Sequence, residues 1–292
     1  MPRRLAAKCI PFAVMMSIRK LGLFVFVPWV AAWSMPLCGH AQGTDANLPD
    51  SPLPASTSPT PEHRALTDRE ETWRTLPGDF LHDQKGIWLF PVQLGKGHHW
   101  LPVLAVAGVT TGLIYADPHV MPYFRSHETN LDDLNDVFDP YISTGEIAAI
   151  PASLLAAGYI RRDPYQVSTA LLAADAYADS AIVDLAVKAV TRRERPSDIP
   201  VGKPFTNTFF NGNKSPLKGS SFPSGHAAGA FSVATVVARR YANHRWVPWT
   251  VYGFATVISF SRVTSMAHFP SDVFLGAAIG YTTTRYATLQ PR

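Results

Sequence analysis

The feature that most constrains the fold is a series of six apolar segments rich in Ala, Leu and Val. None shows the sustained polar–apolar alternation that a half-buried strand needs. Pro164 and Pro270 stand where a first helical turn tolerates proline, and Ser224 and Ser271 are plausible helix N-caps. The sequence therefore predicts an all-α fold, a six-helix bundle with its functional site at one end. The segments are approximately 101–116, 142–160, 165–190, 224–241, 246–262 and 270–288.

The N-terminus has the features of an export signal. A basic pair at 19–20 precedes an apolar run over 21–35, and Ala41 follows at a plausible cleavage site. We expect a signal peptide over residues 1–41, with Met16 as an alternative start. An uncleaved membrane anchor is the alternative, because the same apolar run serves either role.

Closely spaced Pro, Ser and Thr residues follow the signal and cannot bury enough apolar surface to fold. We expect a linker over 42–80 and one folded domain over 81–292. Both cysteines, Cys9 and Cys38, lie within the first forty residues, which excludes disulfides and thiolate metal sites from that domain. A formal charge of +4 with scattered Lys and Arg gives no footprint for nucleic acid.

Three short stretches carry candidate chemistry, and the first two could bind an anion. Lys188 and Arg195 are seven residues apart before a proline, so we expect them on one helical face. Ser224 and Gly225 open an apolar segment, where free N–H groups at a helix start can hold a phosphate, and His226 follows at the rim. Taken alone, the first stretch is more typical of a solvated basic helix end, and the second is as typical of an ordinary capped helix.

The third stretch pairs a histidine with a carboxylate. Arg262 closes one apolar segment, and the spacing of four between His268 and Asp272 predicts that these two side chains lie close together. A carboxylate hydrogen-bonded to one imidazole nitrogen would leave the other nitrogen free as a nucleophile. A helix-capping Asp beside an incidental His is the alternative for this stretch taken alone.

Taken together, K-x6-R-P, P-S-G-H and S-R-x5-H-x3-D resemble the signature of the type 2 phosphatidic acid phosphatase superfamily over about residues 101–281. This superfamily includes bacterial lipid phosphatases, class A acid phosphatases and vanadium haloperoxidases. The resemblance implies a phosphatase domain over 81–292 with His268 as nucleophile, His226 as general acid and Asp272 as the orienting carboxylate. It also implies a set of phosphate-binding residues: Lys188, Arg195, Ser224, Gly225 and Arg262.

The expected activity is hydrolysis of phosphomonoester or diphosphate groups through a phosphohistidine intermediate, with lipids as the expected substrates. No metal-ligand cluster accompanies the three cations, so we expect no metal and no cofactor, with vanadate as an inhibitor. The local sequences F-P-S-G-H and H-F-P-S-D are most similar to those of bacterial lipid phosphatases. The alternatives are a vanadate-dependent haloperoxidase and a non-catalytic exported lipid-binding protein.

The remaining expectations concern acidic residues and location. Asp175, Asp179 and Asp184 could line a substrate groove, but a polar helix face or ion pairs such as Asp184–Lys188 are favoured. We expect a phosphorylated lipid or small phosphoester substrate, no nucleic acid, and a bacterial-type cell envelope location on the periplasmic side. Arginines in the connections opposite the site favour an integral protein with an external site, whereas an exported linker and short segments favour a peripheral bundle.

Overall fold

The computed structural model describes residues 69–97, 99–127, 132–210 and 220–291, and every regular element in these ranges is helical. The predicted all-α class is confirmed for this part of the chain. Each of the six apolar segments lies in a helix. These helices are α3 (Trp100–Ser126), α5 (Pro140–Arg161), α6 (Pro164–Thr191), α7 (Gly225–Arg240), α8 (Trp246–Thr264) and α9 (Pro270–Thr283).

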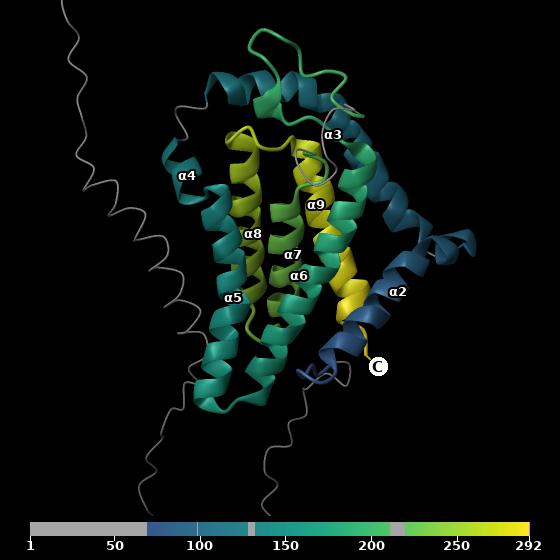
Figure 1. The fold of residues 1–292 in the computed structure, drawn as a ribbon, viewed down its shortest axis with the longest axis vertical. Coiled ribbons are helices and arrows are strands. Elements are labelled where there is room, and N and C mark those ends of the chain that lie inside the picture. The colour runs from purple at the N-terminus through teal and green to yellow at the C-terminus, as the bar shows by residue number, and fades with distance from the viewer. Residues whose placement is uncertain (1–68, 98, 128–131, 211–219, 292) are drawn as a thin grey trace, which may run out of the picture.

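Helices α5 to α9 lie side by side, with α7 packed against α6, α8 and α9 (Figure 1). Aliphatic side chains that are at most 1% exposed fill the space between them, including Leu172, Val233, Val236 and Ile258. Two glycines of α9 allow the closest approach: a Cβ at Gly276 would overlap the Ser224 carbonyl, and one at Gly280 would overlap the carbonyl of Ala228. Small residues thus fix α9 against α7.

Helix α3 lies outside this group and crosses α9 (Figure 1). Most of its side chains are exposed, including Leu101, Leu104 and Tyr115, and so is Trp88 of the preceding helix α2 (Leu76–Gly95). Among the helices in the described ranges, α3 has the length and apolar composition needed to cross a bilayer. The six predicted helices therefore differ in role, because five build the core and α3 covers one side of it.

The segment before α2 packs on the bundle. Arg69 and Glu71 are buried, and Arg69 donates hydrogen bonds to Asp83 of α2, Asp175 of α6 and the Thr288 carbonyl. Residues 69–80, the last part of the expected linker, thus include ordered contacts and the start of α2. The expected signal peptide over 1–41 and the linker over 42–68 lie outside the described residues.

One end of the bundle is where α6 and α8 end and α7 and α9 begin. The α5–α6 and α7–α8 connections, which contain the arginines, lie at the opposite end, as expected from the sequence. Arg240, however, is buried there, with its guanidinium 3.8 Å from the Tyr165 ring centroid and hydrogen-bonded to the Arg69 carbonyl. Its charge is therefore used inside the fold and is not a surface charge.

Candidate active site

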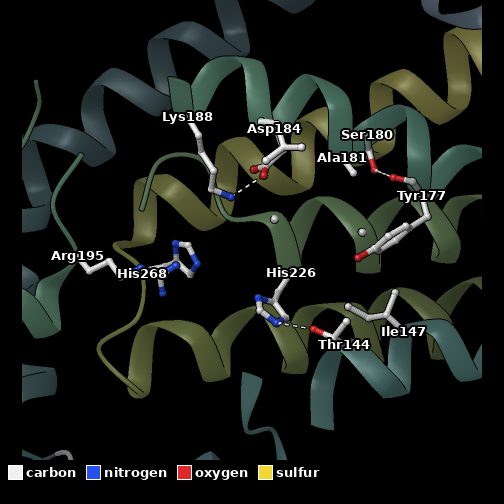
Figure 2. A pocket seen from close by; sticks show the side chains of 13 residues that line it. Thr144, Ile147, Tyr177, Ser180, Ala181, Asp184, Lys188, Arg195, His226 and His268 are labelled. Carbon is white, nitrogen blue, oxygen red and sulfur yellow. Dashed lines mark hydrogen bonds and ion pairs between the residues drawn. The ribbon is translucent and has the colours of Figure 1, made fainter. Parts of the chain in front are cut away.

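The three sequence motifs meet at the end of the bundle where α7 and α9 begin. They surround a cavity of about 270 Å³. In Figure 2, Lys188, Arg195, His226 and His268 gather around the same space. The cavity-lining residues are Thr144, Ile147, Tyr177, Ser180, Ala181, Asp184, Leu185, Lys188, Arg195, Gly225, His226, Gly229 and His268.

Arg195 reaches this cavity by a different route from the one the sequence predicted. Helix α6 ends at Thr191, and Arg192 follows in the left-handed conformation, with φ 41°. Arg195 therefore lies in the connection after α6, immediately before a short 3-10 turn, η2 (Pro196–Asp198). The expectation that Lys188 and Arg195 share a helical face was wrong, although the turn still brings both side chains to the cavity.

His268 is 2% exposed, and its Nδ1 atom lies 2.7 Å from the Ser221 carbonyl oxygen. A carbonyl can only accept a hydrogen bond, so Nδ1 carries the proton and Nε2 has the lone pair. Burial lowers the pKa of His268, and the nearby cations Arg195 and Lys188 lower it further. Asp272 raises this pKa, but its effect is smaller than that of burial. The ring is therefore neutral at neutral pH and has one unprotonated nitrogen.

Asp272 lies beside His268, with Oδ2 3.6 Å from Nδ1. At this distance the carboxylate acts on the ring through its charge, and the tautomer is fixed by the Ser221 carbonyl instead. Oδ2 accepts the Phe269 N–H at 2.8 Å, and Oδ1 accepts from Arg193 at 2.6 Å. Burial opposes ionisation, but His268 and Arg193 outweigh it and hold the pKa of Asp272 below its usual range.

The start of α7 forms another side of the site. Ser224 is the N-cap, as predicted, and its Oγ accepts the Ala227 N–H at 3.4 Å. Gly225 leaves room for its neighbours, since a Cβ there would lie 3.2 Å from the Lys188 ammonium nitrogen. The Nε2 atom of His226 lies 3.1 Å from the Thr144 hydroxyl of α5, a contact that orients the ring (Figure 2).

Ser271 does not cap α9, contrary to the sequence prediction. Phe269 is the N-cap residue, and Asp272 at the third helical position accepts its N–H. The hydroxyl of Ser271 instead donates to Asp117 of α3 at 2.5 Å. The Asp272 side chain therefore has two roles: it accepts the N–H of the N-cap residue, and it is the carboxylate beside His268.

Three predicted site residues do not line the cavity. Ser224, Arg262 and Asp272 are all fully buried behind its wall. Arg262 donates from Nε and Nη2 to the Ser261 hydroxyl, and its Nη1 has no hydrogen-bond partner within the described ranges. Burial lowers the pKa of Arg262 to about 10, so it is still a cation at neutral pH.

Four further residues belong to the site but were missed. Glu146, beside Arg262, is buried, and burial raises its pKa to about 7. Thr144, Arg193 and Asp117 contact His226, Asp272 and Arg193, respectively. For Glu146 and Asp117 the available signal was a single acidic residue within or next to an apolar segment, and for Arg193 it was an additional arginine inside the first motif. Thr144 carried no such signal.

The acidic residues of α6 separate into two groups. Asp184 pairs with Lys188 at 2.5 Å, as the favoured interpretation predicts, and it also lines the cavity, as the alternative predicts. Asp175 and Asp179 lie on the other face of α6, where ligand atoms from these two residues and Asp83 are within 4.8 Å of one another. This carboxylate group is the part of the described structure that could hold a metal ion, and it lies outside the cavity wall.

The comparisons with known proteins match part of this chain. The PAP2 superfamily model matches residues 167–292. A stretch of 64 residues, 21% of this chain, is 42% identical to lipid A 1-phosphatase from Porphyromonas gingivalis and spans 14% of that protein's length. A transmembrane PAP2-type phosphatidylglycerolphosphate phosphatase from Bacillus subtilis superposes with a TM-score of 0.37 and 17% identity, covering 70% of this chain and 94% of that one. The residues that match the PAP2 superfamily, 167–292, contain all eight predicted site residues.

Proposed function

We propose that this protein is a metal-independent phosphatase that hydrolyses phosphorylated lipids through a phosphohistidine intermediate on His268. The observation that carries the proposal is the state of that side chain. It is buried, neutral and held by the Ser221 carbonyl with Nε2 unprotonated, and it lines a cavity shared with Lys188 and Arg195. Nucleophile and anion-binding groups thus meet in one place.

In the first step, Nε2 of His268 forms a bond to phosphorus while the bond from phosphorus to the leaving oxygen breaks. Lys188 and Arg195 balance the charge on the equatorial oxygens, together with the N–H groups at the start of α7. Arg262, buried behind the cavity wall, adds a further positive charge near the site. His226 gives its proton to the leaving oxygen.

In the second step, His226 takes a proton from water, the water oxygen attacks phosphorus, and the bond to His268 breaks. Free phosphate and neutral His268 result. Asp272 stabilises the positive charge that the ring carries while it is phosphorylated. No step in this scheme requires a metal ion, because the cations and the helix start supply the positive charge.

A lipid substrate is supported by the shape and surroundings of the cavity. Its volume of about 270 Å³ accommodates a phosphorylated headgroup but not two hydrocarbon chains. Ile147, Ala181 and Leu185 form an apolar border next to the charged end. The apolar side chains exposed on α2 and α3 suit contact with a membrane surface, which would hold the rest of the lipid. The related stretch of lipid A 1-phosphatase agrees with this substrate class.

The test separates the two histidines. We expect His268→Ala and His226→Ala each to lower kcat on an alkyl phosphate by about a thousandfold or more. With an aryl phosphate, whose leaving group needs little protonation, His226→Ala should still form a burst of phosphohistidine, whereas His268→Ala should form none. Rapid quenching of a labelled substrate measures both, and label trapped on His268→Ala protein would refute the proposed nucleophile.

Substrate class and reaction class are tested in the same preparation. Phosphate release is measured on phosphatidate-type and lipid A-type vesicles and on soluble phosphomonoesters, with vanadate-dependent bromide oxidation in parallel. Faster release from the lipids supports the proposal. Faster release from soluble esters would contradict the lipid assignment, and bromide oxidation without phosphate release would contradict the hydrolytic one.

A further inference from the structure

Arg193 connects the proposed catalytic carboxylate to helix α3. It is 2% exposed, and its Nη1 donates to Asp272 at 2.6 Å and to the Ser271 hydroxyl at 2.7 Å. Its Nη2 donates to Asp117 at 2.8 Å. The guanidinium also lies 3.8 Å from the Phe269 ring centroid, which fixes its plane.

Asp117 completes the network from the other side. It is fully buried on α3 and accepts hydrogen bonds from Arg193, from the Ser271 hydroxyl at 2.5 Å and from the Ser271 N–H at 3.3 Å. Asp117 thus contacts the first turn of α9 directly, one residue before Asp272. Helix α3 is therefore tied to the residues beside His268 by buried, charge-assisted hydrogen bonds.

We infer that Asp117 and Arg193 are positioning residues that hold Asp272 beside His268 and set the charge that the imidazole experiences. This inference rests on the proposed phosphohistidine function. Arg193 aims Oδ1 of Asp272 away from the ring and leaves Oδ2 facing it, 3.6 Å from Nδ1. Asp117 takes up part of the guanidinium charge.

The charge balance explains why a second carboxylate is needed. When both carboxyl groups are ionised, one arginine shared by two aspartates leaves the group with a net negative charge, which stabilises a cationic phosphorylated imidazole. If Asp117 were neutral, the full charge of Arg193 would cancel that of Asp272 at the ring. In Asp117→Asn, the remaining oxygen could still accept from Arg193 and the Ser271 hydroxyl, whereas the hydrogen bond from the Ser271 N–H would be lost. The stabilisation of the ring would fall, because these charges interact in a dry interior.

The first experiment is a double-mutant cycle between Asp117→Asn and Asp272→Asn. Asparagine keeps the shape and most hydrogen-bonding capacity of Asp117, so the fold should be preserved. We expect Asp117→Asn to lower kcat by about ten- to a hundredfold with KM changed by less than about threefold. In the double variant, Asp117→Asn should have little additional effect on kcat, since it acts through Asp272. Full additivity would overturn the inference.

A matched control is available on the same helix. Arg125 of α3 donates to the carbonyls of Pro196 and Ile199 at 2.7 and 2.9 Å and makes no contact with Asp272. Arg125→Ala should loosen the docking of α3, so its effect on kcat should be additive with that of Asp272→Asn. If Arg125→Ala is also non-additive, docking of α3 as a whole would explain the effect, and the specific role of Asp117 would be wrong.

The second experiment does not depend on catalysis. Histidine labelled with ¹⁵N is titrated by NMR, and the His268 signal is identified by its loss in His268→Ala. We expect Asp117→Asn to lower the pKa of His268, in the same direction as Asp272→Asn, because each substitution removes a nearby negative charge. An unchanged titration in Asp117→Asn would refute the inference even if the protein proves to have no phosphatase activity. Absence of phosphatase activity with a shifted titration would refute only the proposed function.

Discussion

The ammonium nitrogen of Lys188 lies 2.5 Å from a carboxylate oxygen of Asp184, one turn earlier on α6, and both side chains line the cavity. Asp184 is buried, so its charge offsets that of Lys188 where the phosphate is expected to bind. Orthovanadate, a mimic of the transferring phosphoryl group, reports on this balance. We therefore expect the site to bind a phosphate-like anion more weakly than it would if the charge of Lys188 were not offset by Asp184.

We therefore expect Lys188→Met and Asp184→Asn to change vanadate inhibition in opposite directions. Loss of a charged donor costs about 1.5–3 kcal/mol, so Lys188→Met should raise the inhibition constant by about ten- to a hundredfold. Asp184→Asn should lower it, because the ammonium charge is no longer offset. Steady-state inhibition measures both, and a weaker inhibition in Asp184→Asn would show that Asp184 mainly orients Lys188.

The pH dependence of kcat/KM should reflect the neutral state of His268. Burial lowers the pKa of this side chain below its usual 6.5, and attack requires the unprotonated ring. Activity should therefore rise with pH through a midpoint below 6.5 and should persist in mildly acidic buffer. A pH–rate profile of the wild type checks this, and an acid limb above pH 7 would contradict the assignment.

Chelation should leave the initial rate unchanged. Lys188, Arg195 and Arg262 supply the positive charge at the site, and the carboxylate group of Asp83 and Asp175 lies outside the cavity wall. We expect equal initial rates at 25 °C with and without EDTA. Thermal denaturation in the same buffers is the control, because a fall in Tm without a fall in rate would locate any metal effect away from the chemistry. Activity lost in EDTA and restored by a divalent ion would refute the prediction.

Stability should depend on pH through Asp175. Burial raises the pKa of Asp175 from its usual 3.8 to about 8. A carboxyl group whose pKa is higher in the folded state stabilises the fold fully below its unfolded pKa. That stabilisation is lost as the pH rises through the folded pKa. The pKa of Asp179 is raised to about 6, and this group acts in the same direction.

We therefore expect Asp175→Asn to be close to the wild type in stability at pH 5 and more stable than the wild type at pH 8.5. The comparison at each pH cancels the opposite contribution of His268, whose lowered pKa costs stability below pH 6.5. Urea denaturation at the two pH values measures the difference. Equal stability differences at both values would show that Asp175 does not titrate in this range.

Gly280→Ala tests the close packing of α9 on α7. The added methyl group would overlap the Ala228 carbonyl, so the helices must separate. We expect a loss of about 1–3 kcal/mol in the free energy of unfolding. The matched control is Gly253→Ala on α8, where a Cβ has no neighbour within 4 Å and should stabilise the helix by up to about 1 kcal/mol. A neutral Gly280→Ala would contradict the packing.

The sequence by itself determined the helical class, the approximate helix positions and the side chains that line the reactive end of the cavity. Apolar segments without alternation exclude strands locally, and the motif residues follow from their types and spacing. Lys188, Arg195, Gly225, His226 and His268 could be named because they occupy the phosphate-binding and reactive positions of the three motifs.

Only the tertiary structure decided how these side chains are held. The proton on His268 is fixed by the carbonyl of Ser221, 47 residues earlier, and no side-chain pattern encodes a backbone acceptor. The partners of Asp272 come from Arg193 and, through it, from Asp117 on α3. Burial shifts the pKa of His268, and Arg192 turns the chain toward the cavity. These properties depend on which distant segments pack together, and local periodicity and residue type do not specify that packing.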